Sequence, residues 1–316
     1  MRLVVALGGN ALLERGEAPD SEIQERHVQR AVEALTPLVE QHEVTVTHGN
    51  GPQVGVLAIE SANDTSLGHP YPFDALGAQT QGLIGYWLIQ ALQSALPDRE
   101  VACVLSRTIV DSTDPAFSNP SKFVGPVYTK ARAEHLAADF GWDVRADGQY
   151  WRRVVPSPEP QTIVELNMIR LLIDGGAVVV CMGGGGIPVV RESGGQLRGV
   201  EAVIDKDLGA ALLAEKLGAD GLLLLTDVSA VELDYGTAKA RPIGHTTVEE
   251  LRSTSFPAGS MGPKVAAACR FVERSGGLAA IGSLDDAALL LSGNVGTLIR
   301  PTAGAAASHG DTRSGT

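Results

Sequence analysis

The sequence has few aromatic residues and few cysteines. Aromatic residues make up 4% of the 316 residues, and there are three cysteines, Cys103, Cys181 and Cys269. The cysteines lie far apart, each in an apolar run, with no C-x-x-C pair and no His-Cys spacing typical of zinc sites. We therefore expect reduced cysteines in the core and no protein-held metal.

Positive charge is also scarce. The chain has 25 Lys and Arg against 37 Asp and Glu, a formal net charge of −12. Nucleic acids and anionic membranes are bound by clustered Lys and Arg, so neither is an expected partner. The apolar run at residues 3–7 is too short for a signal peptide, and no later run is long enough to span a membrane. We expect a cytoplasmic, soluble protein.

Glycine, in contrast, is abundant, with 37 residues. Apolar strand-like runs alternate with helical patterns along the chain, which predicts an α/β fold. The pattern fits one large α/β unit or two fused halves. Long helical patterns cover residues 22–39 and 73–96, and the second of these could serve a subunit interface or pack in the core.

Two predicted strands in the first half end in loops of glycine and asparagine. Residues 3–7 lead into the first loop and residues 44–47 into the second, which also contains His48 and Pro52. Parallel strands bring such loops to one edge of the sheet, where backbone N–H groups could bind a carboxylate or phosphoryl oxygen. Two ordinary turns are the alternative. The candidate binding residues are Gly8, Gly9, Asn10, Gly49, Asn50 and Gly51.

Residues 113–155 have the composition of a small appended lobe. Recurring prolines predict no regular structure at 113–126, which contains Lys122. A short helix is expected at 130–140, and Asp147-Gly148 predicts a hairpin between 142–145 and 150–155. Ordered insertions of this kind often act as lids, although Lys122 could also be a solvated loop lysine.

The second half repeats the pattern of strands that end at polar or glycine-rich loops. The strand at 177–182 runs into four glycines, a ribbon is expected at 189–198, and the strand at 221–225 ends beside Asp227. The glycines are Gly183, Gly184, Gly185 and Gly186. Further helices are expected at 162–173, 265–274 and 284–291, strands at 278–281 and 296–299, and a disordered tail at 301–316.

Lysines mark two helix starts in this half. Lys206 and Asp207 open an alanine- and leucine-rich helix, and Lys264 follows a loop containing Gly259 and Ser260. A helix start favours anions, so Lys206 and Asp207 predict a phosphate site, with a capped helix and a solvated lysine as the alternative. Asp227 could border a ligand or cap a turn.

These features favour phosphoryl transfer over covalent catalysis. No Ser-His-Asp set, paired carboxylates or metal cluster can be assembled, and His48 is interpreted as a structural residue. The three lysines and the N–H groups at strand ends provide positioning and charge neutralisation, which phosphoryl transfer needs most.

Four segments of the sequence resemble the amino-acid-kinase superfamily, namely residues 6–12, 48–55, 181–190 and 200–208. Within this superfamily the carbamate kinase family is the most similar, and that similarity rests on residues 114–126, 151–160 and 259–265. The resemblance covers roughly residues 2–300. Phe123 and Val124 follow Lys122 where the family usually has Pro and Ile, and residues 232–242 match weakly.

The resemblance implies an open three-layer αβα sandwich with a central, mostly parallel sheet of about eight strands and a protruding subdomain at about 113–155. It implies a homodimer that transfers a phosphoryl group reversibly between MgATP and carbamate, giving MgADP and carbamoyl phosphate. Residues 1–174 would bind carbamate or carbamoyl phosphate, and residues 175–300 would bind the nucleotide. Mg²⁺ would be held by phosphate oxygens and water. The direction would be ATP formation in arginine or related nitrogen catabolism.

The resemblance also implies roles for single residues. Lys206 would neutralise the transition state, Asp207 would orient the lysines, Lys264 would hold nucleotide phosphates, and Lys122 would reach in from the lobe. The acceptor would bind at Gly8, Gly9, Asn10, Gly49, Asn50 and Gly51. The nucleotide would contact Gly183, Gly184, Gly185, Gly186, Asp227, Tyr235 and Lys264.

Two other functions stay open at this point. A sister kinase acting on acetylglutamate or UMP would need a larger acceptor pocket than the tight loops suggest. A non-catalytic sensor of nucleotide or carbamoyl phosphate would bind without turnover.

Overall fold

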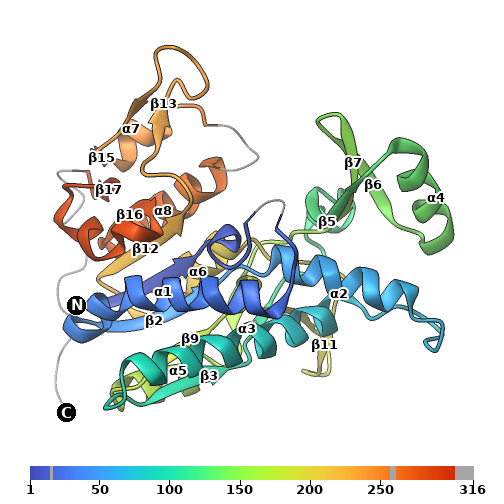
Figure 1. The fold of residues 1–316 in the computed structure, drawn as a ribbon, viewed down its shortest axis with the longest axis horizontal. Helices are drawn as coiled ribbons and strands as arrows, with labels where there is room; N and C mark the ends of the chain where they lie inside the picture. The colour runs from blue at the N-terminus through green and yellow to red at the C-terminus, as the bar shows by residue number, and fades with distance from the viewer. Residues whose placement is uncertain (15–16, 257–260, 303–316) are drawn as a thin grey trace.

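The computed structural model describes residues 1–14, 17–256 and 261–302 (Figure 1). Two regions that the sequence analysis mentions lie outside these ranges. They are the loop residues Gly259 and Ser260, and the part of the expected tail (301–316) that follows Thr302. The largest sheet has eight strands in the order β15-β17-β16-β12-β1-β2-β9-β3. All neighbouring pairs are parallel except β16 and β17. Its strands are β1 (Arg2–Leu7), β2 (Glu43–His48), β3 (Val101–Val104), β9 (Val178–Cys181), β12 (Gly221–Thr226), β15 (His245–Thr247), β16 (Leu278–Ser283) and β17 (Thr297–Arg300).

Helices cover both faces of this sheet, as the expected sandwich requires. Side chains alternate along β1, so that Leu3 and Val5 join one apolar core while Val4 and Ala6 join the other. The first core is closed by α1 (Ser21–Gln41), α3 (Phe73–Ala95) and the 3-10 helix η4 (Leu284–Ser292). The second is closed by α5 (Leu166–Asp174), α6 (Lys206–Leu217), α7 (Val248–Arg252) and α8 (Met261–Ser275). The predicted fold class is confirmed.

Smaller sheets surround the main one. A four-stranded sheet contains β11 (Leu197–Gly199), β10 (Ile187–Arg191), β4 (Arg107–Ile109) and β8 (Thr162–Ile163), in that order. Its β10 and β11 pair in antiparallel fashion, which confirms the predicted ribbon. β13 (Glu232–Leu233) and β14 (Arg241–Pro242) form a further pair. Short 3-10 turns are η1 (Gly9–Ala11), η2 (Pro115–Phe117) and η3 (Gly183–Gly185).

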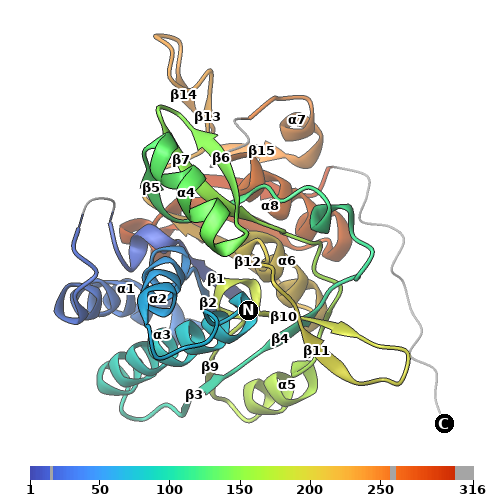
Figure 2. The same ribbon diagram turned by 90° about the vertical axis from the view of Figure 1, so that its right-hand side faces the viewer.

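A lobe of three strands and one helix projects from the body (Figures 1 and 2). It contains β5 (Lys122–Tyr128), α4 (Lys130–Phe140), β6 (Asp143–Asp147) and β7 (Tyr150–Val155). The predicted helix and hairpin are confirmed, with Gly148 in the turn at φ +63°. The absence of regular structure predicted at 113–126 is wrong at η2 and from Lys122 onward. Pro126 is tolerated in β5 because the register with β7 shifts between Val124 and Tyr128.

Two predicted helices differ from the structure. The helix expected at 162–173 begins only at Leu166, because Thr162 and Ile163 pair with β4. Residues 284–292 wind as a 3-10 helix and not as an α-helix. The three cysteines are free, with Cys181 and Cys269 buried. Gly85 on α3 packs against Cys103, so this part of α3 serves core packing. Each helix in the described ranges is too short or too polar to traverse a bilayer.

Candidate active site

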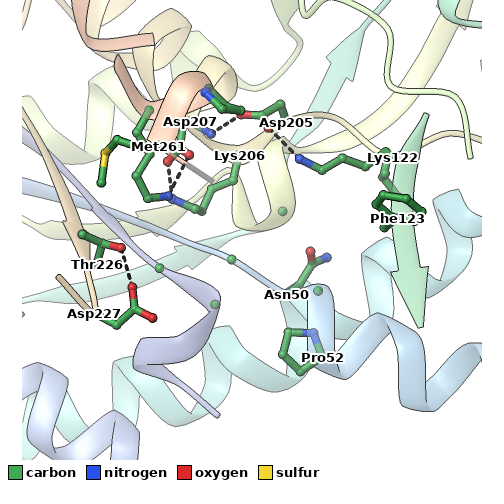
Figure 3. Close-up of a pocket in the computed structure, with 18 of the residues that line it drawn as sticks. Asn50, Pro52, Lys122, Phe123, Asp205, Lys206, Asp207, Thr226, Asp227 and Met261 are labelled. Carbon is green, nitrogen blue, oxygen red and sulfur yellow. Dashed lines mark hydrogen bonds and ion pairs between the residues drawn. The ribbon is translucent and has the colours of Figure 1, made fainter. Parts of the chain in front are cut away.

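A cavity of about 670 Å³ lies where loops from both halves of the chain meet (Figure 3). The loops after β1 and β2 touch each other there, since a Cβ atom at Gly49 would lie 2.9 Å from the backbone nitrogen of Gly9. The N–H of Gly8 donates to the carbonyl oxygen of Leu225 at the end of β12, at 3.0 Å. The three strand ends therefore form one wall, as the parallel sheet predicts.

The glycine and asparagine loops line this wall. Asn50 precedes α2 (Gly51–Asn63) and donates from its side-chain amide to the Thr80 hydroxyl at 2.9 Å. This bond orients the amide beside the cavity. The predicted residues that line the cavity here are Gly8, Gly9, Gly49, Asn50 and Gly51. The backbone of Asn10 lies in η1, and its side chain is outside the described part of the structure.

The four-glycine loop contributes less surface than expected. Only Gly184 is among the cavity-lining residues, while a side chain at Gly183, Gly185 or Gly186 would meet His48, Ile204 or Thr108 respectively. Gly184 has φ +65°, and an added Cβ would overlap the Asn50 amide. The loop thus packs directly behind Asn50, and its lack of side chains makes room for that packing.

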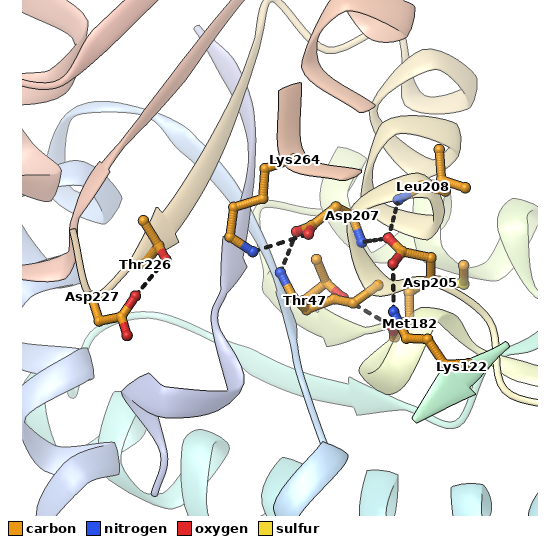
Figure 4. A network of polar contacts seen from close by, with 10 residues as sticks. Thr47, Lys122, Met182, Asp205, Asp207, Leu208, Thr226, Asp227 and Lys264 are labelled. Atoms are coloured by element: carbon orange, nitrogen blue, oxygen red, sulfur yellow. Dashed lines mark hydrogen bonds and ion pairs between the residues drawn. The ribbon is translucent and has the colours of Figure 1, made fainter. Parts of the chain in front are cut away.

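Lys206, Asp207 and Lys264 form a charged cluster at the cavity (Figures 3 and 4). One oxygen of Asp207 lies 2.5 Å from the Lys206 amine, and the other lies 3.0 Å from the Lys264 amine. The three side chains are 13%, 6% and 15% exposed, respectively. One buried carboxylate therefore holds two amines from different helices.

The electrostatics of this cluster favour an anionic ligand. Burial alone would raise the pKa of Asp207, but the charges of Lys206 and Lys264 outweigh burial and hold that pKa well below its usual range. Burial lowers the pKa of the Lys206 amine, and Asp207 only partly opposes this. With two ammonium groups against one carboxylate, a phosphoryl group would supply the missing negative charge.

Lys122 reaches the same cavity from the lobe. Its amine lies 2.6 Å from one oxygen of Asp205, a residue that sequence reasoning did not select (Figure 4). The other oxygen of Asp205 accepts from the N–H groups of Asp207 and Leu208, which caps α6. An aspartate directly before a helix is a capping signal, but its lysine partner is 83 residues away in sequence.

The other predicted residues line the far side of the cavity, beside β12 and α8. The Thr226 hydroxyl donates to the carboxylate of Asp227 at 3.0 Å. Tyr235 is 67% exposed at the rim. Cavity-lining residues that sequence reasoning did not select here include Glu232, Phe256 and Met261. Glu232 lies in the short strand β13 and Phe256 in a loop, whereas Met261 is the first residue of α8.

His48 is buried behind the glycine and asparagine loops. Its Nδ1 atom lies 2.9 Å from the carbonyl oxygen of Gly49, so this nitrogen carries the proton. Burial lowers the pKa of His48 to about 4, and the nearby Lys206 charge also lowers it. The ring is therefore neutral near pH 7, which agrees with a structural role.

The fold and this site define an enzyme class. The family model described as the amino acid kinase family matches residues 1–283. A carbamate kinase of Rhizobium meliloti is 50% identical over 302 residues, which is 95% of this chain and 93% of that protein. One of Haemophilus influenzae is 47% identical over 95% of this chain and 96% of its own length. The chain belongs to the amino acid kinase family and, within it, to the carbamate kinases.

Solved structures agree with this assignment. Carbamate kinase from Giardia lamblia bound to AMP-PNP is similar with a TM-score of 0.87 and 38% identity, covering 95% of this chain and 98% of that one. Isopentenyl phosphate kinase of T. acidophilum, at 15% identity and a TM-score of 0.53, shares only the fold.

Proposed function

We propose that this protein is a kinase that moves a phosphoryl group reversibly between MgATP and carbamate, giving MgADP and carbamoyl phosphate. The observation that carries the proposal is the pair of amines, Lys206 and Lys264, held by Asp207 beside the glycine loops. The curated relatives across nearly the full chain are carbamate kinases.

The chemistry needs no nucleophile from the protein. In the direction of ATP formation, an oxygen of the ADP β-phosphate attacks the phosphorus of carbamoyl phosphate. The bond from phosphorus to the carbamate oxygen breaks, and its electron pair leaves with carbamate. Lys206 would neutralise the charge on the moving group, and Lys122 would approach it from the lobe. Gly8, Gly9, Gly49, Asn50 and Gly51 would hold the acceptor end.

The nucleotide would occupy the other end of the cavity. Lys264 would bind its phosphates, while Asp227 and Tyr235 border the space available to it. Gly184, which packs against Asn50, would face the phosphates where the two ends of the cavity meet. The wall of the cavity at Gly184 would be supported from behind by Gly183, Gly185 and Gly186. Asn10 would extend the acceptor loop. Residues 1–174 would thus bind the acceptor, and residues 175–300 would bind the nucleotide.

Mg²⁺ fits this arrangement as a companion of the nucleotide. Asp227 and Glu232 are oxygen donors of the kind that Mg²⁺ prefers, but no group of three or more potential metal ligands occurs among the described residues. Phosphate oxygens and water would therefore hold most of its coordination shell. When bound, Mg²⁺ would neutralise phosphate charge.

The test is ATP formation from MgADP and carbamoyl phosphate. We expect Lys206→Ala to lower turnover by about 100- to 1000-fold, as loss of one transition-state charge does. Lys216→Ala is the matched control, since Lys216 lies at the other end of α6 and is paired with Glu215. An unchanged rate for Lys206→Ala would remove Lys206 from the mechanism.

Inactive but folded wild-type protein would contradict the proposal. Thermal stabilisation by acetylglutamate or UMP, without stabilisation by carbamoyl phosphate, would then favour a sister kinase. Binding of carbamoyl phosphate or nucleotide without turnover would favour a sensor.

We further propose a cytoplasmic homodimer that makes ATP from carbamoyl phosphate in arginine or related nitrogen catabolism. The three free cysteines suit a reducing compartment. Sedimentation of the purified protein tests the dimer, and growth of a deletion strain on arginine as energy source tests the pathway. A monomer, or unchanged growth, would contradict the respective part.

A further inference from the structure

The lobe is tied to the short segment that leads into α6. Lys122 on β5 pairs with Asp205 at 2.6 Å, and Arg153 on β7 pairs with Glu201 at 2.8 Å. The N–H of Val203 donates to the carbonyl oxygen of Pro156 at 3.0 Å. These contacts join residues 201–205 to the lobe and to Pro156, which directly follows it, and Lys206 comes next in the chain.

Asp205 differs from Glu201 in what its carboxylate does. One oxygen of Asp205 holds the Lys122 amine, while the other accepts N–H groups from Asp207 at 2.9 Å and Leu208 at 3.2 Å. The Asp205 side chain is 13% exposed, whereas that of Lys122 is 40% exposed. A single, largely buried carboxylate therefore connects the lobe lysine to the backbone that carries Lys206 and Asp207.

This connection matters because a lysine has a long, flexible stem. Without a partner, the half-exposed Lys122 side chain would sample many rotamers and point into water. An ammonium group has three N–H donors. After one goes to Asp205, two are left for phosphoryl oxygens, so the contact need not break when a substrate binds.

We propose that Asp205 is a positioning residue that points Lys122 at the phosphoryl group and keeps its amine at a fixed position relative to Lys206. This rests on the proposed function for the role of Lys122. The geometry itself, an ion pair between the lobe and the α6 cap, is independent of that function.

Asp205→Asn separates the two roles of the carboxylate. Asparagine caps helices as well as aspartate does, but it carries no charge for Lys122. We expect Asp205→Asn to keep a thermal midpoint near that of the wild type and to lose about 10- to 100-fold in kcat/KM for carbamoyl phosphate, the cost of a misplaced catalytic group. Asp205→Ala should lose stability as well. Full kcat/KM in a folded Asp205→Asn variant would overturn the proposal.

Glu201→Gln is the matched control for the tether, by which we mean the ion pair between Lys122 and Asp205. It removes the charge of the other ion pair between the lobe and the same segment but leaves Lys122 and Asp205 in place. We expect a change in kcat/KM of less than about 3-fold, the size of a partly exposed pair. A loss equal to that of Asp205→Asn would show that only lobe attachment matters, which contradicts a specific role for Asp205.

A double-mutant cycle tests whether Asp205 acts through Lys122. In a Lys122→Ala background, Asp205→Asn should cause little further loss of kcat/KM, because the group it positions is absent. Fully additive losses would contradict the proposal.

A second measurement does not depend on activity. Acylating reagents attack accessible amines, and the Lys122 amine, held 2.6 Å from the Asp205 carboxylate, is screened from such reagents. Mass spectrometry of acetic-anhydride-treated protein should show faster acetylation of Lys122 in Asp205→Asn than in the wild type or Glu201→Gln. An equal rate in all three would refute the ion pair. If the wild type makes no ATP while this result holds, the proposed function fails and the tether stands.

Discussion

The amine of Lys264 lies 3.0 Å from the carboxylate of Asp207, which joins α8 to α6 inside the cavity. Asp207 also contacts the adjacent Lys206, so its loss would leave two amines without their shared counter-charge. We therefore expect Asp207 to contribute to both activity and stability.

We expect Asp207→Asn to lower kcat for ATP formation by about 100- to 1000-fold, because both lysines lose the charge that orients them. The free energy of unfolding should fall by about 3 kcal/mol, since two largely buried amines lose their counter-charge. Urea titration and steady-state kinetics measure the two effects. Asp174→Asn, which removes an exposed partner of Arg2, should change stability by less than about 1 kcal/mol. Equal effects of the two substitutions would contradict this account.

Gly184→Ala should weaken acceptor binding. The added Cβ would overlap the Asn50 amide, and the residue would have to keep φ +65°. Gly176→Ala is the control, because Gly176 has φ +88° but nothing within 4 Å of an added Cβ. We expect both to lower stability by about 1 kcal/mol from the backbone alone. Only Gly184→Ala should also raise KM for carbamoyl phosphate, and unchanged KM would show that Asn50 adjusts without cost.

Acid should destabilise the protein partly through His48. Its pKa is about 4 in the fold, below the ordinary value of 6.5, so the unfolded state binds more protons between these pH values. Neutral His48 makes its full contribution to the free energy of unfolding above pH 6.5. This contribution decreases as pH falls to about 4, by about 3 kcal/mol in total.

Chemical denaturation at several pH values measures how the free energy of unfolding changes with pH. His48→Gln should weaken this pH dependence, whereas His69→Gln at an exposed position should not. A slope unaffected by His48→Gln would mean that other groups cause the acid sensitivity.

Removal of divalent metal should stop turnover without unfolding the protein. The described residues contain no cluster of three potential metal ligands, so the fold itself should not depend on a metal. We expect EDTA to abolish ATP formation, with recovery on adding Mg²⁺, and to leave the thermal midpoint of ligand-free enzyme unchanged. A lower midpoint in EDTA would indicate a structural metal site.

Much of the site was predictable because it depends on local patterns. Each strand that ends in a Gly-Asn loop belongs to a parallel sheet, and the shared sheet edge brought Gly9 and Gly49 together as expected. The start of α6 was likewise visible from sequence, because lysine and aspartate are the first two residues of an alanine- and leucine-rich helix.

Features that depend on distant pairing were missed. β8 forms only because Thr162 and Ile163 pair with β4, more than fifty residues earlier in the chain. β5 tolerates Pro126 only because of its irregular register with β7. Asp205 could be recognised as a cap but not as the partner of Lys122, since that contact depends on how the lobe folds back.

The pairing of β1 with β12 has one more consequence. The two strands are parallel neighbours, with Leu7 opposite Leu225, so the loops that follow them start about 5 Å apart. That interval is set by backbone hydrogen bonds and does not depend on any side chain. Replacing side chains in these loops or in the lobe would therefore leave the spacing between the two loops unchanged, which makes the lobe the natural place to alter the lining of the cavity.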